Sequence, residues 1–455
     1  MKKSIKTPQK IIAFVVLVAT LFSTMIIPSY ASPSAPLDFT VDAEAALLIN
    51  LDNEQRTVLY EKNADQKRAP ASLTKIATAA TAFSKGVDLD AKTTVSYNAI
   101  HSLDGTGSSM ANLQVGEELT IRQLMYLIML HSAGDACNVL AEYVAGSIEE
   151  YVKMMNEWAK SIGCENTNFV NTVGIDNENH YTTANDIAKM TIKALENSDF
   201  EEISTTVTYK MAATNKSPER TFTHRNSMLN KGTGYYYKYA DGIKTGTTTN
   251  AGRCVVTRAS KDGYNYLCIV MGGILKDYTN DGLADVGCFF DAKNLFEWAF
   301  DNFKIKTIAK TTQVVATIPI KNAKGSDELQ LVPQTDISSL VPKALDSSAL
   351  VYKLHDDAPK QVNAPIKKGD VVAKADVIYA NEVITTVTLV AANDVERSIP
   401  LLIYNTINDL LSTIWAKIVL AVIVLLIIAY IVITIVYNIK RKKKKMRQVK
   451  DYRKM

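Results

Sequence analysis

A long apolar run without charged residues near the C-terminus limits most strongly what this chain can fold into. The run covers residues 418–439, which is long enough for a helix to span the hydrocarbon core of a bilayer. Ten basic residues and one aspartate follow in 440–455. Because Lys and Arg concentrate on the cytoplasmic side of a span, we predict a single-pass cell-membrane protein. Its basic tail would be cytoplasmic, and all residues before the transmembrane helix would lie outside.

The N-terminal segment has the parts of a secretory signal peptide. Residues 2–10 carry four lysines, and residues 11–27 are mostly apolar. Residues 29–31 are Ser-Tyr-Ala, which places small residues three positions and one position before the predicted cleavage site. We therefore predict a signal peptide over 1–31. An uncleaved N-terminal anchor is the alternative that the sequence leaves open.

The body between the two ends is acidic. The formal charge of the chain is +4, of which 1–31 carries +4 and 440–455 carries +9, so that 32–439 carries −9. A nucleic-acid-binding domain would be basic, and the charge therefore argues against nucleic acid as a partner. The length of 455 residues and the hydrophobic fraction of 47% predict two folded domains with accessory segments.

The cysteines and histidines do not indicate a disulfide framework or a metal site. The five cysteines are odd in number, widely spaced and set in apolar contexts, which predicts buried thiols; they are Cys137, Cys164, Cys254, Cys268 and Cys288. The five histidines lack the spacing of a zinc peptidase. We expect no metal and no cofactor.

The exported body changes character near residue 310. Residues 37–305 mix helical periodicity with short strand-like runs and predict an α+β domain with helices and a small antiparallel sheet. Residues 310–396 alternate as strands do and predict a small all-β domain, interpreted as a spacer or interaction module, and 397–417 predict a juxtamembrane segment. The expected elements are strands at 45–49, 57–62, 239–246, 252–259 and 264–271, a helical stretch at 120–145 with a break at 131–135, and a closing helix at 291–303.

A serine and a lysine stand three residues apart at a predicted helix start. Pro70 suits a first helical turn, and Ser72 and Lys75 then lie one turn apart on the same face. A serine hydroxyl needs an adjacent base to become a nucleophile, and a lysine is such a base when burial and cationic neighbours lower its pKa. By itself this spacing also occurs at many ordinary helix starts.

Two further motifs in order along the chain make the pattern specific. Ser132 lies in the polar break, and Lys244-Thr245-Gly246 ends a strand-like run. The three motifs together resemble the active site of penicillin-binding proteins and serine β-lactamases. Over about residues 40–395 the chain resembles more closely the D-alanyl-D-alanine carboxypeptidases, the low-molecular-weight penicillin-binding proteins. The segments that carry this likeness are 47–49, 60–65, 70–75, 132–142, 180–184 and 225–229.

The resemblance implies a fold and a reaction. The fold would be a β-lactamase/transpeptidase-like catalytic domain, followed by the β domain that the family also carries. The enzyme would remove the terminal D-alanine from peptidoglycan pentapeptide stems, as a serine peptidase of cell-wall organisation and cell shape. β-Lactams would inhibit it by acylating the same serine.

The resemblance also implies roles for single residues. Ser72 would attack the carbonyl between two D-alanines, Lys75 would be its base, and Ser132 would relay the proton to the leaving amine. The substrate carboxylate would bind the Lys244-Thr245-Gly246 segment with help from Arg225, and the backbone N–H groups of Ser72 and Thr247 would form an oxyanion hole.

One position departs from the family pattern. The second motif is usually Ser-x-Asn, but here it is Ser132-Ala133-Gly134. In the family that amide would hydrogen-bond the lysine and the substrate backbone. Without it, we expect catalysis to be slower by roughly tenfold to a hundredfold, unless water or Asn138, one helical turn further on, partly substitutes for it. A glycine that merely makes a sharper turn is the structural alternative.

Two other functions remain as alternatives. A β-lactamase would need a dedicated deacylating base, for which 165–168 could be offered, although 163–174 resembles the carboxypeptidase loop more. From a different class, the altered Gly134 would suit a membrane-tethered protein that binds peptidoglycan or senses β-lactams through a degenerate site. Ser72 and Lys75 are both intact, which favours the enzyme.

Overall fold

The computed structural model describes residues 35–52 and 56–452, so the signal peptide predicted for 1–31 lies outside the described residues. The chain divides into two compact units. The first contains the chain up to 306 with the segments 338–350 and 378–385, and the second contains 307–337, 351–377 and the residues from 386 onward.

A five-stranded antiparallel sheet forms the centre of the first unit. Its order is β2-β1-β9-β8-β7, as expected from the predicted hairpin and the three closely spaced strands. β1 is almost entirely apolar because both faces of the sheet are covered: Leu47 belongs to one core cluster and Leu48 to the other. The strands are β1 (Ala45–Asn50), β2 (Val58–Lys62), β7 (Ala240–Thr248), β8 (Gly252–Lys261) and β9 (Tyr264–Gly273).

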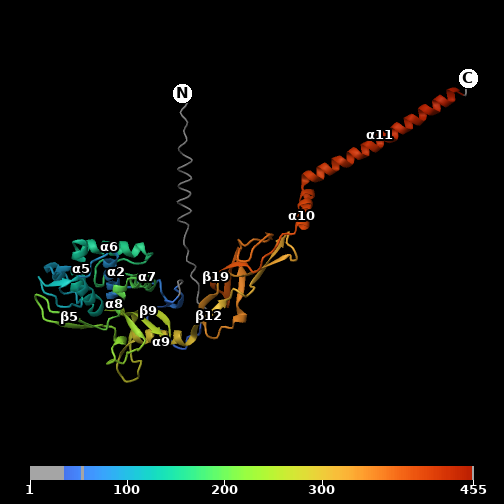
Figure 1. Cartoon of the computed structure of the whole chain (residues 1–455). Coiled ribbons are helices and arrows are strands. Elements are labelled where there is room, and N and C mark those ends of the chain that lie inside the picture. Colours follow the sequence, from blue (N-terminus) through green and yellow to red (C-terminus); the bar gives the residue numbers. More distant parts are fainter. Residues whose placement is uncertain (1–34, 53–55, 453–455) are drawn as a thin grey trace, which may run out of the picture. The chain divides into compact units, whose positions relative to one another are not determined.

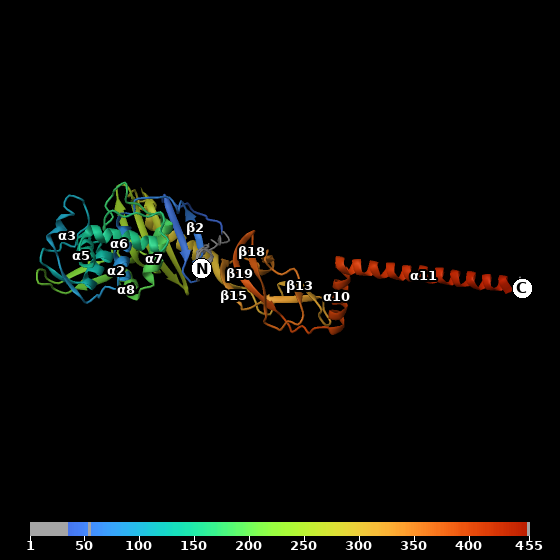
Figure 2. The ribbon, with the colours of Figure 1, turned by 90° about the horizontal axis from the view of Figure 1, so that it is seen from above.

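Helices cover both faces of this sheet (Figure 1). One face packs on a helical group that is seen together in both Figure 1 and Figure 2. This group consists of α2 (Thr74–Ser84), α4 (Ile121–Tyr126), α5 (Gly134–Ala145), α6 (Ile148–Ser161), α7 (Ala184–Leu195) and α8 (Ser198–Thr205). The other face packs on α9 (Gly287–Asn302), which begins four residues before the predicted range.

Short elements connect the helices and the sheet. They are α3 (Tyr97–His101), η1 (Ala71–Leu73), η3 (Ser227–Leu229) and the two-stranded pairs β3 (Lys92–Thr94) with β4 (Glu118–Thr120), β5 (Thr208–Met211) with β6 (Arg220–Thr223), and β10 (Leu275–Lys276) with β11 (Asp285–Val286). The β5–β6 hairpin was not among the elements expected from the sequence. It joins α8 to η3.

The predicted break in the 120–145 stretch is confirmed, and its form is unusual. Thr120 and Gln123 make a capping box at the start of α4. The chain then widens into a π-helical turn, η2 (Leu127–His131), and ends in a left-handed residue, Ser132, with φ 64°. Helix α5 starts directly afterwards. A π-turn often marks a functional site, and here it presents Ser132 at the end of an otherwise buried segment.

From residue 303 onward the sequence is rich in strands and ends in two helices, as the predicted fold class requires. A six-stranded sheet has the order β16-β18-β19-β14-β13-β17. Its strands are β13 (Ala316–Lys321), β14 (Glu328–Pro333), β16 (Val351–Leu354), β17 (Val362–Asn363), β18 (Val371–Tyr379) and β19 (Glu382–Ala391), and β12 (Phe303–Ala309), β15 (Ile337–Pro342) and η4 (Ser347–Ala349) complete this part.

Helices α10 (Ile399–Ser412) and α11 (Ile414–Tyr452) follow the strands. Within the described parts of the chain, α11 holds the one stretch long and apolar enough to cross a membrane, Ile414–Lys444, and none of its most apolar window is buried. This result agrees with the predicted membrane span, and Figure 2 shows α11 as one continuous helix.

The loop between α6 and α7 presses against the start of α2. Gly174 in this loop has φ +90°, and a Cβ atom there would lie 1.8 Å from the carbonyl oxygen of Ala71 and 3.0 Å from the backbone nitrogen of Ser72. Only glycine permits this approach of two backbones. The turn that carries Ser72 is therefore positioned in part by a residue a hundred positions away.

Replacing Gly174 by alanine should destabilise the fold far more than replacing Gly86. Both glycines have positive φ, but a Cβ at Gly86 would meet nothing within 4 Å. Gly86→Ala therefore costs only the strain of a left-handed residue, about 1 kcal/mol, whereas Gly174→Ala adds a collision with backbone and costs about 3 kcal/mol. Thermal unfolding of the two variants checks this, and equal decreases in Tm would contradict the close approach.

Candidate active site

The predicted nucleophile and base lie in contact at the start of α2. Ser72 is in the 3₁₀ turn η1, and Lys75 is in the first turn of the helix. The Lys75 Nζ donates hydrogen bonds to the Ser72 Oγ, at 3.0 Å, and to the carbonyl oxygen of Val173, at 2.6 Å. Lys75 is fully buried while Ser72 is half-buried. The geometry thus brings a buried amine to a hydroxyl that substrate can reach.

Burial changes the charge state of this lysine. Desolvation is the largest effect and lowers the pKa of Lys75; among the smaller effects, Cys137 and Asp135 raise it and the positive charge of Arg225 lowers it. A lysine with a lowered pKa is more often neutral at physiological pH, and only the neutral amine accepts a proton. The site is therefore suited to general-base activation of Ser72.

The third predicted motif lies beside this pair, on the edge strand β7. Lys244 is fully buried, and its Nζ donates to the carbonyl oxygen of Thr245 at 3.0 Å. Desolvation lowers the pKa of Lys244 strongly, and the charges of Lys75 and Arg225 add to the effect. A Cβ atom at Gly246 would lie 3.1 Å from the backbone nitrogen of Ser72. The free edge of β7 therefore runs along η1, the turn that carries the predicted nucleophile Ser72 and is called the nucleophile turn below.

The other predicted residues border the same place. Ser132 is buried in the turn between η2 and α5, and η2 packs on both α2 and β7. Arg225 is exposed, and its backbone N–H donates to Leu130 at the end of η2. Its guanidinium donates to the Ser109 Oγ at 2.8 Å. Thr247 is exposed on β7, next to Gly246.

Asn138 does not take the place of the missing amide, and that expectation was wrong. Its Nδ2 donates to the Ala99 carbonyl and to the Ser102 Oγ, and its Oδ1 accepts from Thr172. All hydrogen-bonding groups of this side chain are thus in use away from Ser72. Asn138 instead fixes Thr172, the neighbour of the Val173 carbonyl that receives Lys75.

Sequence reasoning missed the loop that holds Lys75. The Val173 carbonyl accepts from Lys75, and the Asn171 Oδ1 accepts from three successive backbone N–H groups, those of Val173, Gly174 and Ile175. Asn and Gly in this loop were a weak turn signal. A carbonyl group leaves no trace in the residue type, so the role of Val173 could not be read from the sequence.

The structure also bears on the cysteines, on the β-lactamase alternative and on metal binding. The five cysteines are free and buried, as predicted. Glu165, from the segment considered as a β-lactamase base, is exposed, and the contacts to Lys75 and to the nucleophile turn come instead from Val173 and Gly174. Among residues 35–52 and 56–452, no group of three or more His, Cys, Asp or Glu could hold a metal ion.

Fold and site together define a class. A serine paired with a buried lysine, at the start of a helix and beside an edge strand carrying Lys-Thr-Gly, is the arrangement of a serine acyl-transfer enzyme of the penicillin-binding type.

Comparison with known proteins identifies the family within this class. The family model described as D-alanyl-D-alanine carboxypeptidase matches residues 30–274, and the model described as penicillin-binding protein 5, C-terminal domain, matches residues 303–397. The chain belongs to the D-alanyl-D-alanine carboxypeptidase family.

Individual relatives agree with this family. D-alanyl-D-alanine carboxypeptidase DacC of Escherichia coli is 30% identical over 79% of this chain and 85% of its own length. DacF of Bacillus subtilis is 29% identical over 78% of this chain and 87% of its own length. These similarities support the enzymatic interpretation over a binding or sensing protein.

Solved structures give the same fold. The Streptomyces K15 DD-transpeptidase is 28% identical and covers 59% of this chain and 100% of its own, with a TM-score of 0.52. Penicillin binding protein 5 from Haemophilus influenzae, 24% identical, covers 80% of this chain and 100% of its own with a TM-score of 0.60. The second similarity shows the fold alone.

Replacing Arg225 by alanine should move the pH dependence of acylation to higher pH. The charge of Arg225 lowers the pKa of Lys75, so removing it lets that pKa rise. Acylation needs the neutral lysine, so its rate constant increases as the pH rises through this pKa. In the variant this increase therefore occurs at higher pH. The measurement is the second-order rate constant for acylation by a fluorescent penicillin as a function of pH. Arg225→Lys keeps the charge and should leave this increase at the same pH; an equal shift in both variants would contradict the electrostatic cause.

Proposed function

We propose that this chain removes the terminal D-alanine from peptidoglycan stem peptides through an acyl-enzyme on Ser72. The observation that carries the proposal is the contact between the Ser72 hydroxyl and the buried amine of Lys75. Membership in the carboxypeptidase family supplies the reaction class and implies stem peptides as substrates and β-lactams as ligands. The roles of the single residues are those that the family resemblance implies, and their places in the site support them.

Acylation proceeds by attack of the Ser72 Oγ on the carbonyl between the last two D-alanines. Lys75 takes the hydroxyl proton while the new C–O bond forms. The backbone N–H groups of Ser72 and Thr247 stabilise the oxyanion. The C–N bond then breaks, and Ser132 passes the proton from Lys75 to the departing amine of D-alanine.

The edge strand β7 and Arg225 bind the substrate carboxylate. Lys244 and Thr245 lie on β7 next to the nucleophile turn, and Gly246 allows the strand to approach Ser72 closely. Arg225 adds a second cation on the exposed side. Water then hydrolyses the ester, which frees Ser72 and a stem peptide shortened by one D-alanine.

The proposal for the membrane rests on α11 and the basic residues that end it. The apolar part of α11 would cross the membrane, with the catalytic residues outside and the tail in the cytoplasm. The two-domain body would then remain next to the peptidoglycan it acts on. The β-rich region would serve as a spacer or interaction module.

Replacing Ser72 by alanine should abolish release of D-alanine. Without the hydroxyl no acyl-enzyme forms, and the rate falls on the order of 10⁴-fold or more. The assay measures free D-alanine produced by the full-length chain in detergent from a peptide that ends in D-Ala-D-Ala. Ser84→Ala, at the exposed end of the same helix, is the matched control and should retain full activity. Equal release by the wild type and Ser72→Ala would contradict the role of Ser72.

Truncation after residue 413 should release the protein from membranes. The truncation removes α11, the candidate span, so the shortened chain should leave the membrane pellet in a carbonate wash while the full chain stays. A tag at the C-terminus of the full chain should resist protease added to cells without a wall. A truncated chain that stays in the pellet, or a tag cut from outside, would contradict the proposed topology.

A further inference from the structure

The position of the missing amide is not empty. A Cβ atom at Gly134 would lie 2.4 Å from the Ser108 Oγ, 3.1 Å from Leu103 and 3.3 Å from the carbonyl oxygen of Ser109. The first of these distances is a collision, so the hydroxyl of Ser108 already occupies the volume in which a side chain at 134 would begin. The glycine and the serine therefore fit one another as a pair.

The loop that carries Ser108 is fixed directly to the second motif. The backbone N–H of Gly134 donates to the Ser109 carbonyl at 2.7 Å. The carboxylate of Asp135, which is fully buried, accepts from the backbone N–H groups of Ala111 and Leu113, each at 3.0 Å. Two consecutive residues of α5 thus hold both sides of the 108–113 segment, which places its two serines beside Gly134, two residues after Ser132.

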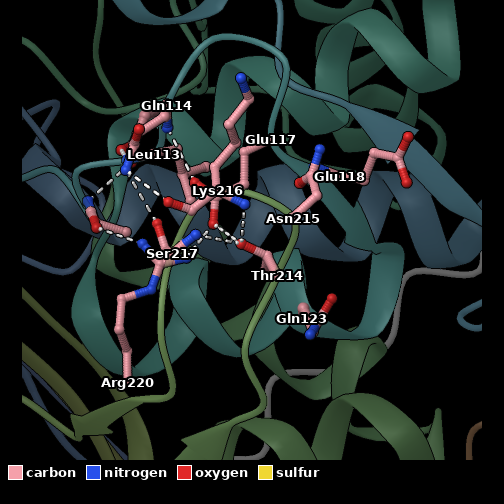
Figure 3. Close-up of polar contacts among 12 residues, drawn as sticks. Leu113, Gln114, Glu117, Glu118, Gln123, Thr214, Asn215, Lys216, Ser217 and Arg220 are labelled. Atoms are coloured by element: carbon pink, nitrogen blue, oxygen red, sulfur yellow. Dashed lines mark hydrogen bonds and ion pairs between the residues drawn. The ribbon is translucent and has the colours of Figure 1, made fainter.

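A second buried carboxylate holds the far end of this loop. Glu117 is fully buried, forms an ion pair with Arg220 of β6, and accepts from the Thr214 hydroxyl at 2.8 Å and from the Gln114 backbone N–H at 3.0 Å. Figure 3 shows the side chains of Glu117, Thr214 and Arg220 converging there. The β5–β6 hairpin is thereby tied to the loop, which adds to the rigidity of its serines.

The two serines differ in what their hydroxyls contact. The Ser109 Oγ accepts the 2.8 Å hydrogen bond from Arg225, the exposed cation of the site. Within the described parts of the chain, the Ser108 Oγ has only a long contact, 3.5 Å, with the neighbouring Ser109 carbonyl, and its residue is half-buried. The Ser108 hydroxyl therefore retains the capacity to donate a strong hydrogen bond to a group that enters the site.

We propose that Ser108 is a substrate-binding residue that takes over the hydrogen bond of the absent amide at position 134, while Ser109 positions Arg225. This inference rests on the proposed function and names a further group of the same site. The ligand group is a backbone carbonyl of the stem peptide, because a serine hydroxyl donates to such an acceptor as a carboxamide N–H does.

A double-mutant cycle tests the pairing of Ser108 with Gly134. The variants are Ser108→Ala, Gly134→Asn and the double variant, all as full-length chains in detergent. The readouts are kcat/KM for D-alanine release, the rate constant for acylation by a fluorescent penicillin, and Tm. Gly105→Asn is the matched control, because Gly105 lies in the same loop, has φ +73° and has nothing within 4 Å of a Cβ.

The expected outcome is strong coupling between the two positions. Ser108→Ala lowers kcat/KM about tenfold, the worth of one lost hydrogen bond, at an unchanged Tm. Gly134→Asn lowers kcat/KM at least as much, because its Cβ displaces the Ser108 hydroxyl from the position in which it donates. The double variant, which regains an amide without the collision, is more active than either single variant, and Gly105→Asn stays within about twofold of the wild type, since Asn tolerates positive φ.

Several results would overturn the inference. A rise in kcat/KM on Gly134→Asn with Ser108 in place would show that the amide is simply missing, and an unchanged rate in Ser108→Ala would remove the role of its hydroxyl. Additive effects of the two changes would show that the positions act independently. If the wild type releases D-alanine and is acylated, these results contradict only the role of Ser108; if it does neither, the proposed function and this inference fall together.

Discussion

The structure depends on a contact between a half-buried hydroxyl and a fully buried amine, the pair Ser72 and Lys75. Burying an ammonium group is costly. This cost lowers the pKa of Lys75 and so favours its neutral amine. Chemistry and stability therefore favour the same protonation state. The Val173 carbonyl accepts from Lys75, which orients the amine and keeps it within reach of Ser72.

The rest of the first unit serves to bring separate backbones close to that pair. The loop with Gly174 approaches the nucleophile turn so closely that only glycine leaves enough room, and a Cβ at Gly246 on the edge strand would make a tight contact, 3.1 Å, with the same turn. Helices on one face of the sheet bury Lys75, and β7 contributes Lys244 from the sheet itself. Burial lowers the pKa of both lysines, the charge of Arg225 lowers both further, and the charge of Lys75 also lowers the pKa of Lys244.

The sequence predicted those parts of fold and site that rest on local patterns. The hairpin of β1 and β2, the polar break before α5 and the Ser72–Lys75 contact follow from periodicity, turn residues and helical spacing. Gly134 shows where this reasoning ends. The effect of Gly134 on the site depends on Ser108. The buried carboxylates of Asp135 and Glu117 hold the loop that brings Ser108 beside Gly134. Neither the packing around a glycine nor the bonds that use up Asn138 can be read from residue types alone.

We propose that Ser72 is the residue that becomes acylated. Mass spectrometry of the full-length chain after exposure to a β-lactam, followed by mapping of the modified peptide, tests this assignment. We predict a single covalent adduct, with the mass of the intact antibiotic, on the peptide that contains Ser72. An unmodified chain, or an adduct on a different residue, would contradict it.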